Sequence, residues 1–116
     1  MSLTALDGRS MRVYICRHMF EIRLARGALQ DLKSLRARDR ARVVDEIERC
    51  LVEQPQEPSR NRKQLTALVP PWEHAPPVWE LRVDDYRVFY DVDAGARVVV
   101  VRAVRRKGRS TTKEIV

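Results

Sequence analysis

A dense group of basic side chains lies near the C-terminal end of this sequence. Its members are Arg102, Arg105, Arg106, Lys107, Arg109 and Lys113, and Glu114 is the acid beside them in the sequence. Arginine meets phosphate through a planar fork of donors that stays charged, so such a group attracts a phosphate backbone whatever its base sequence. The group would equally suit a solvated tail or an acidic segment of a partner protein, and the sequence leaves these alternatives open.

Arg87 is a second candidate, and it stands in the alternating segment YRVFYDVD (residues 86–93). The alternation predicts a central strand on which Arg87 points away from the neighbouring apolar side chains. On that face its guanidinium could bind a phosphate group through its planar fork of donors. The alternative is a surface arginine that pairs with Asp85 or Asp91.

Acid–base chemistry has weaker candidates in the same region. Glu80 lies on the preceding strand, where it could act as a base or pair structurally with Arg82 or Arg87. His74 has an ordinary pKa suited to proton transfer near neutral pH. Trp72, which follows two prolines, is hard to bury and could contact a partner. A structural or solvent-exposed role is the alternative for each of these residues.

Two helices and a sheet are expected to position these side chains. Apolar residues at alternate positions from Phe20 to Leu24 predict a strand, and helical spacing follows from Ala25 to Leu35. A second apolar stripe, from Val43 to Leu51, predicts another helix, with Asp39 as its N-cap. That helix should end at or before Gln54, because a proline follows and disfavours helical geometry in the residue before it.

Three further strands are predicted over residues 79–83, 86–92 and 97–104, joined by turns at Asp84-Asp85 and at residues 93–95. All six prolines precede them, within a stretch for which no regular structure is predicted. The order strand–helix–helix–strand–strand–strand indicates an α+β fold, with a helical hairpin packed on a small, mainly antiparallel sheet. Residues 19–116 are expected to form this domain. Residues 1–18 are expected to be a leader or an N-terminal extension, either disordered or extending the first strand.

Composition restricts the class of protein further. The chain has 116 residues, which suits one domain, and its 23 Lys and Arg against 16 Asp and Glu give a net charge of +7. Such a charge favours nucleic acid or an acidic protein as partner. The two cysteines are far apart and form no CxxC pair, which argues against a disulfide scaffold or a zinc site. No apolar run approaches the roughly 20 residues of a membrane span. We therefore expect a cytoplasmic protein without metal or cofactor.

Four segments, ALQDLKSL, RKQL, WELRVDDYRVFYDVD and VVVVRAVRRKG, cover most of the chain from Phe20 to Thr112. Together they resemble the RelE/ParE superfamily of toxins from bacterial type II toxin–antitoxin (plasmid-stabilisation) systems. The resemblance implies one of two activities: RelE-type members cut messenger RNA on the ribosome without a metal ion, whereas ParE-type members bind and poison DNA gyrase. Members of both types are silenced by an antitoxin, and for this basic chain an acidic antitoxin is expected.

Individual residues match the RelE-type pattern in part. Arg87 stands where these nucleases keep an arginine that contacts the scissile phosphate, and Lys107 and Arg109 stand in the segment that carries another phosphate-binding arginine. Lys63 matches a basic residue before the sheet. Glu57 lies in the loop after the second helix, where some relatives carry a catalytic glutamate.

Other positions depart from that pattern. Val78 and Glu80 occupy strand positions where RelE has lysines, and Lys113 lies near the position of a C-terminal tyrosine. The resemblance favours an endoribonuclease over a gyrase-binding toxin or an inactive RelE-like binding domain. Its catalytic candidates are Arg87, Lys63, Lys107, Glu57 and Glu80. The residues expected to bind RNA are Arg102, Arg105, Arg106, Arg109 and Lys113.

Overall fold

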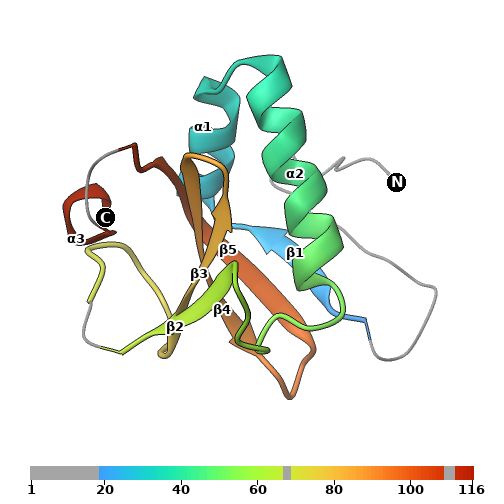
Figure 1. Ribbon diagram of the computed structural model, residues 1–116. Helices are drawn as coiled ribbons and strands as arrows, with labels where there is room; N and C mark the ends of the chain where they lie inside the picture. Colours follow the sequence, from blue (N-terminus) through green and yellow to red (C-terminus); the bar gives the residue numbers. More distant parts are fainter. Residues whose placement is uncertain (1–18, 67–68, 109–111) are drawn as a thin grey trace.

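The computed structural model describes residues 19–66, 69–108 and 112–116, which fold as an α+β domain (Figure 1). The elements in chain order are β1 (Glu21–Leu24), α1 (Arg26–Ser34), α2 (Ala37–Leu51), β2 (Arg62–Leu65), β3 (Val78–Val83), β4 (Tyr86–Asp93), β5 (Val98–Arg106) and α3 (Thr112–Ile115). The predicted order of one strand, two helices and three strands is confirmed, with β2 and the short α3 in addition. The predictions for residues 1–18 lie outside the described residues.

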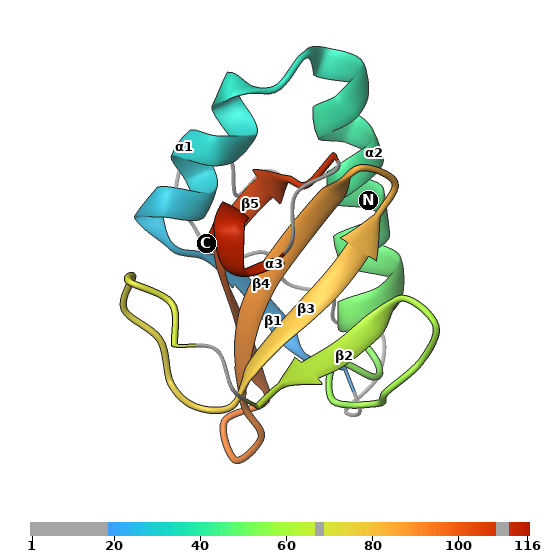
Figure 2. The ribbon, with the colours of Figure 1, turned by 60° about the vertical axis from the view of Figure 1, so that its left-hand side comes forward.

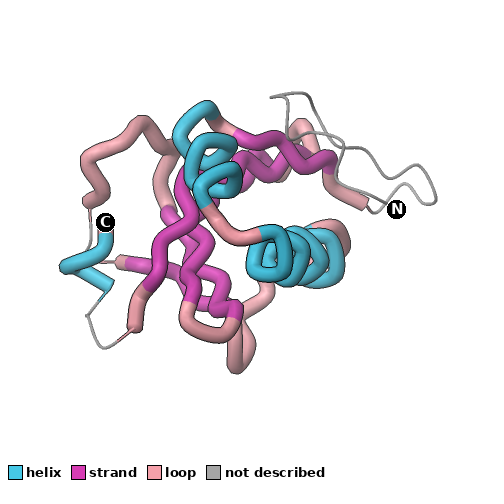
Figure 3. The backbone as a smooth tube through the Cα atoms, turned by 90° about the horizontal axis from the view of Figure 1, so that it is seen from above, coloured by secondary structure: helices cyan, strands magenta, loops and turns pink. Residues whose placement is uncertain are grey.

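All described strands belong to one sheet with the order β1-β5-β4-β3-β2. β1 pairs with β5 in parallel, whereas the other three pairs of neighbours are antiparallel. The long helices α1 and α2 lie on one side of the sheet, and α3 lies on the other side (Figures 2 and 3). The sheet therefore has a helix-covered face and a second face, which we call the polar face.

The hydrophobic core lies between the helical hairpin and the sheet. The apolar stripe predicted for α2 is buried, with Val43, Ile47 and Leu51 fully enclosed, and α1 adds Leu32. Alternate residues of the central strands, such as Leu81, cover them from the sheet. Burying one such aliphatic side chain stabilises a fold by about 1.5–3 kcal/mol. This packing determines which face of the sheet remains for other contacts.

Strand β2 lies within the region where no regular structure was predicted, so that prediction is wrong for these residues. Arg62–Leu65 pairs antiparallel with β3, and Lys63 stands opposite Glu80. The segment RKQL has none of the β-branched or aromatic residues that are enriched in strands. It becomes a strand because β3 offers it an unpaired edge, a condition that the local sequence does not contain. The pairing brings Lys63 beside other candidate residues.

Two boundary predictions also differ from the structure. Arg36 occupies the N-cap of α2, so Asp39 is not the cap but a residue of the first helical turn. The turn before β5 spans residues 94–97 rather than 93–95. The turn between β3 and β4 is confirmed, and Asp84 there adopts a left-handed conformation with φ 52°.

No described helix is long and apolar enough to cross a membrane. No group of His, Cys, Asp and Glu among the described residues is arranged to hold a metal ion. Cys50 is buried on α2, and burial raises the pKa of its thiol, which fits a packing residue.

Glu46 is a buried acid on α2 whose charge is compensated by two arginines. It is 6% exposed and forms ion pairs with Arg49 (2.8 Å) and Arg42 (2.7 Å). The hydrogen bonds from Arg49 and then Arg42 lower the pKa of Glu46 from 4.5 to about 2, against the opposing effect of burial. Because the pKa is lower in the folded state, the ionised carboxylate stabilises the fold above pH 4.5. That contribution is lost as the pH falls toward 2.

We expect Glu46→Gln to lower stability at neutral pH and to flatten the decline of stability between pH 4.5 and 2. The ionised carboxylate contributes up to about 3 kcal/mol above this window. Urea unfolding at a series of pH values measures both effects. Glu53→Gln is the matched control, because Glu53 is an exposed acid just beyond α2. If the stability of Glu46→Gln declines between pH 4.5 and 2 as steeply as that of the parent, other carboxylates cause the pH dependence.

Candidate functional site

Three arginines from adjacent strands lie side by side on the polar face. In the register of the sheet, Arg82 of β3 is opposite Arg87 of β4, and Arg87 is opposite Arg105 of β5. Residues paired across strands point to the same face. We call Arg82, Arg87 and Arg105 the arginine row. Three like charges in adjacent positions repel one another, so the row is a surface that an anion would stabilise.

Arg87, at the centre of the row, is only 7% exposed. Its Nη1 donates to the backbone carbonyls of Asp84 and Tyr86, each at 2.8 Å, while its Nε is buried without a hydrogen-bond partner. Burial lowers the pKa of Arg87, and the nearby charge of Arg82 lowers it further. No ion pair of the described residues includes Arg87. The interpretation as a surface arginine paired with Asp85 or Asp91 is therefore wrong.

Arg105, the β5 member of the row, is held from three directions. Its Nη1 lies 2.6 Å from Oδ2 of Asp31 on α1, and its Nε donates to the carbonyl of Ile115 on α3 at 3.2 Å. Its guanidinium also lies over the ring of Trp72, 5.3 Å from the centroid. These contacts orient the side chain and compensate part of its charge.

The basic group near the C-terminus is less free than the sequence indicated. Besides the pair between Arg105 and Asp31, Arg102 forms an ion pair with Asp91 at 2.7 Å. The sequence neighbours of the group did not indicate these two aspartates, because they lie on distant elements. Among the other members, Arg106 is exposed and Lys107 is half-buried. Arg109 and the side chain of Lys113 lie outside the described part.

Glu80 and Lys63 lie next to the arginine row. The Glu80 side chain is 3% exposed, accepts a hydrogen bond from the Thr112 hydroxyl (2.7 Å) and pairs with the ammonium of Lys63 at 3.6 Å. The negative charges of Glu80 and Asp85 raise the pKa of Arg87, which burial and Arg82 lower. The structure therefore brings three of the predicted catalytic residues together, Arg87, Glu80 and Lys63.

Two other candidates are not joined to this group. Glu57 is exposed in the loop after α2, and its backbone amide donates to the carbonyl of Gln54. His74 Nδ1 lies 2.8 Å from the carbonyl of Trp72. In the described part of the chain, no hydrogen bond or ion pair connects either side chain with the arginine row.

Arg82 is a site residue that the sequence reasoning missed. It lines a small cavity of about 70 Å³ together with Ser59, Arg60, Asn61, Arg62, Lys63 and Glu80. The signal was present in the sequence, because a tight turn at Asp84-Asp85 places Arg82 directly opposite Arg87. The role of Asp31 had no such signal, since it depends on how α1 packs against β5.

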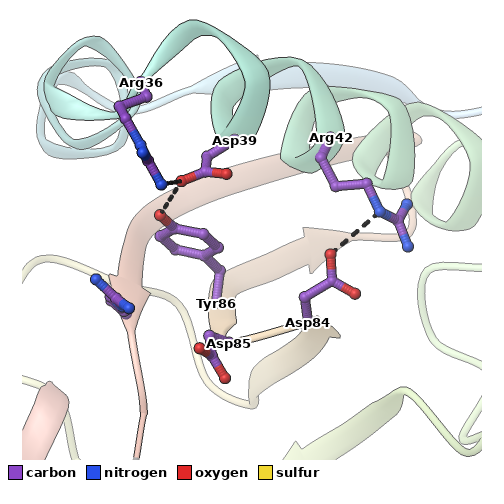
Figure 4. A pocket seen from close by; sticks show the side chains of 7 residues that line it. Arg36, Asp39, Arg42, Asp84, Asp85 and Tyr86 are labelled. Carbon is purple, nitrogen blue, oxygen red and sulfur yellow. Dashed lines mark hydrogen bonds and ion pairs between the residues drawn. The ribbon is translucent and has the colours of Figure 1, made fainter.

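A larger cavity of about 370 Å³ lies between the β3–β4 turn and the N-terminal part of α2 (Figure 4). It is lined by Arg36, Asp39, Arg42, Asp84, Asp85, Tyr86 and Arg106. The Tyr86 hydroxyl donates to Asp39 at 2.8 Å, and Arg42 pairs with Asp84 at 3.2 Å. These contacts fasten the β3–β4 turn to α2. They thereby steady the two carbonyls that align Arg87.

The chain matches one known protein family over most of its length. The model of a family described as the ParE toxin of the type II toxin–antitoxin system parDE matches residues 22–110. No curated protein gives a significant match.

Two solved structures share the fold. The toxin–antitoxin complex RelBE2 from Mycobacterium tuberculosis contains a chain that is 25% identical, with a TM-score of 0.58, covering 76% of this chain and 98% of the other. The archaeal RelE–RelB complex from Pyrococcus horikoshii OT3 contains one that is 20% identical, with a TM-score of 0.61, covering 79% and 99%. With the family model spanning most of the domain, this chain belongs to the ParE toxin family of type II toxin–antitoxin systems, within the RelE/ParE superfamily.

Proposed function

We propose that this chain is a toxin that cleaves messenger RNA at the ribosome through the 2′-hydroxyl, a reaction that needs no metal ion. The observation that carries the proposal is Arg87, whose buried guanidinium is aligned by two carbonyls and lacks a carboxylate partner. Glu80 and Asp85 act on Arg87 without forming an ion pair, and burying a charge without a directly paired counter-ion is costly. A phosphate group would supply that counter-ion, and its oxygens match the fork of N–H donors on arginine.

The neighbouring residues supply the other requirements of the reaction. Cleavage requires a base for the 2′-hydroxyl proton, positive charge on the pentavalent phosphorane and an acid for the leaving oxygen. In this proposal Arg87 bears the phosphorane charge, and Arg82 and Arg105 hold the adjoining phosphates. Glu80 is the base once the hydroxyl of Thr112 no longer occupies it, and Lys63 lies beside it as the proton donor.

The same surface suits an acidic antitoxin. Both similar structures are complexes of a toxin with its antitoxin. This chain carries a net charge of +7, and among the described residues only Arg105 of the arginine row forms an ion pair. An acidic antitoxin segment on that row would block RNA by occupying the same donors. Co-expression of such an antitoxin is therefore expected to relieve toxicity.

The matched family is described as the ParE toxin, and gyrase poisoning is therefore the alternative activity. Induction of the chain in bacteria distinguishes the two. Growth should stop, and primer extension on cellular messages should show discrete new ends. Intact messages together with double-strand DNA breaks would instead identify a gyrase poison. Normal growth at verified soluble expression would contradict both.

We expect Arg82→Ala to weaken RNA binding and to reduce its salt dependence. Each phosphate contact with single-stranded RNA contributes about 0.7 to the slope of log K against log salt concentration. Titration of a labelled RNA with 2′-O-methyl riboses between about 50 and 200 mM salt measures this slope. Arg23→Ala is the matched control, because Arg23 is an exposed arginine on β1 that pairs with Glu21. An unchanged slope in Arg82→Ala would remove Arg82 from the binding surface.

A further inference from the structure

The segment before β3 is packed on the polar face, although it has no regular secondary structure. The amide of Ala75 donates to Oδ2 of Asp91 on β4 at 3.1 Å. Nδ1 of His74 lies within hydrogen-bond distance of the carbonyl of Trp72, and Pro70 is buried. These contacts hold Trp72 in place against the sheet.

The indole of Trp72 lies within the same group of side chains as the arginine row. Its ring packs on Phe89 of β4 at 5.5 Å between centroids, inclined by 48°. Arg105 covers it at 5.3 Å, within the range of a cation–π interaction. Phe89 is two residues from Arg87 on the same strand face, and Arg105 is the cross-strand partner of Arg87. Trp72 therefore packs on two side chains that adjoin Arg87 in the sheet.

Among the described residues, two buried donors on this face have no acceptor: Nε1 of Trp72 and Nε of Arg87. More than about 90% of buried polar groups in native structures are hydrogen-bonded, so each exception requires a reason. Nε1 of Trp79 is also unpaired, but it lies on the helix-covered face, where Trp79 stacks on Tyr90 within the core. Only the first two donors lie where a ligand of the arginine row would bind.

We propose that Trp72 is a substrate-contacting residue, whose indole N–H donates to the nucleotide adjoining the phosphate held by Arg87. This inference rests on the proposed function. One RNA strand satisfies both donors, because successive phosphates and riboses offer acceptors on each side of the scissile bond. The guanidinium of Arg105, which lies over the indole, holds the adjoining phosphate on that side. Trp72 thus selects a strand with a nucleotide on that side of the cleavage position.

Equilibrium binding of a short single-stranded RNA with 2′-O-methyl riboses tests the contact without cleavage. Trp72→Phe keeps a ring against Phe89 and Arg105 but removes the N–H, and we expect it to weaken binding about tenfold. Arg87→Ala should weaken it at least as much. Trp79→Phe is the matched control, because it removes the unpaired N–H of the core, and it should bind like the parent. The chain has two tryptophans, so Trp79→Phe also leaves Trp72 as the sole reporter. Its fluorescence should change when the RNA is added.

The outcomes separate this inference from the proposed function. Thermal melts first establish that each variant is folded. If Arg87→Ala loses affinity while Trp72→Phe binds like the parent, the role of Trp72 is refuted and the phosphate site stands. If the parent does not bind the RNA, or if Arg87→Ala binds it as tightly as the parent does, the phosphate site is refuted. The role of Trp72 is then refuted as well.

Discussion

Arg87→Ala is expected to lower the rate of RNA cleavage by about 10²-fold or more. Removal of one preorganised donor from a charge-stabilising site typically has an effect of this size. Arg87→Lys should recover only part of the loss, because one ammonium group cannot replace the planar fork. Single-turnover cleavage of a reporter message on purified ribosomes measures the rate directly.

The control for Arg87 must account for its burial. The side chain is 7% exposed and donates to the carbonyls of Asp84 and Tyr86, so its removal also costs about 1–3 kcal/mol of stability. Arg87→Met fills much of the same volume without charge and should be equally inactive. Arg97→Ala removes an exposed arginine that lies over Phe20 and should leave the rate unchanged. A folded Arg87→Met protein with full activity would contradict the nuclease mechanism.

Asp31→Ala is expected to give the largest loss of stability among single changes near the site, about 2–4 kcal/mol. Oδ2 of Asp31 accepts hydrogen bonds from the amide of Val104 (2.9 Å) and from Nη1 of Arg105 (2.6 Å). The substitution leaves both donors without this acceptor and removes the polar contacts of Asp31 between α1 and β5. The melting temperature should fall by about 10 °C or more for a domain of this size.

Urea unfolding of three proteins tests the role of Asp31. Asp31→Asn keeps an acceptor for Val104 but loses the charge, so its loss should be smaller than that of Asp31→Ala. Asp45→Ala is the matched control, because Asp45 is an exposed aspartate on α2. If Asp31→Ala unfolds at the same urea concentration as Asp45→Ala, the contacts of Asp31 contribute little net stability.

The helices and the central strands could be predicted because their patterns are local. The stripe of Val43, Ile47 and Leu51 has the helical period, and each of these residues is buried where the stripe predicted. The alternation in β4 correctly placed Arg87 on the face away from the core. The assignment to the superfamily followed from the same segments, and the matched family model covers them.

The site could be predicted only in part, because its contacts join distant segments. Arg105 is paired with Asp31, 74 residues away in the sequence, and Arg102 with Asp91. No local pattern relates an acid on α1 to a base on β5, so the basic group appeared free. The contact between Glu80 and Thr112 of α3 could not be predicted either, because the two residues are 32 positions apart in the sequence.

The sequence by itself determined the alternation of apolar and polar residues, and with it the two helices, the central strands and the face that carries Arg87. Each of these features depends on residues within a few positions of one another. Only the tertiary structure decided that RKQL is an edge strand and that Arg87 is buried without a direct ion pair. It likewise decided that Trp72 packs against Phe89 and Arg105. These features depend on which elements meet, and that is settled by packing across the whole core rather than by any local segment.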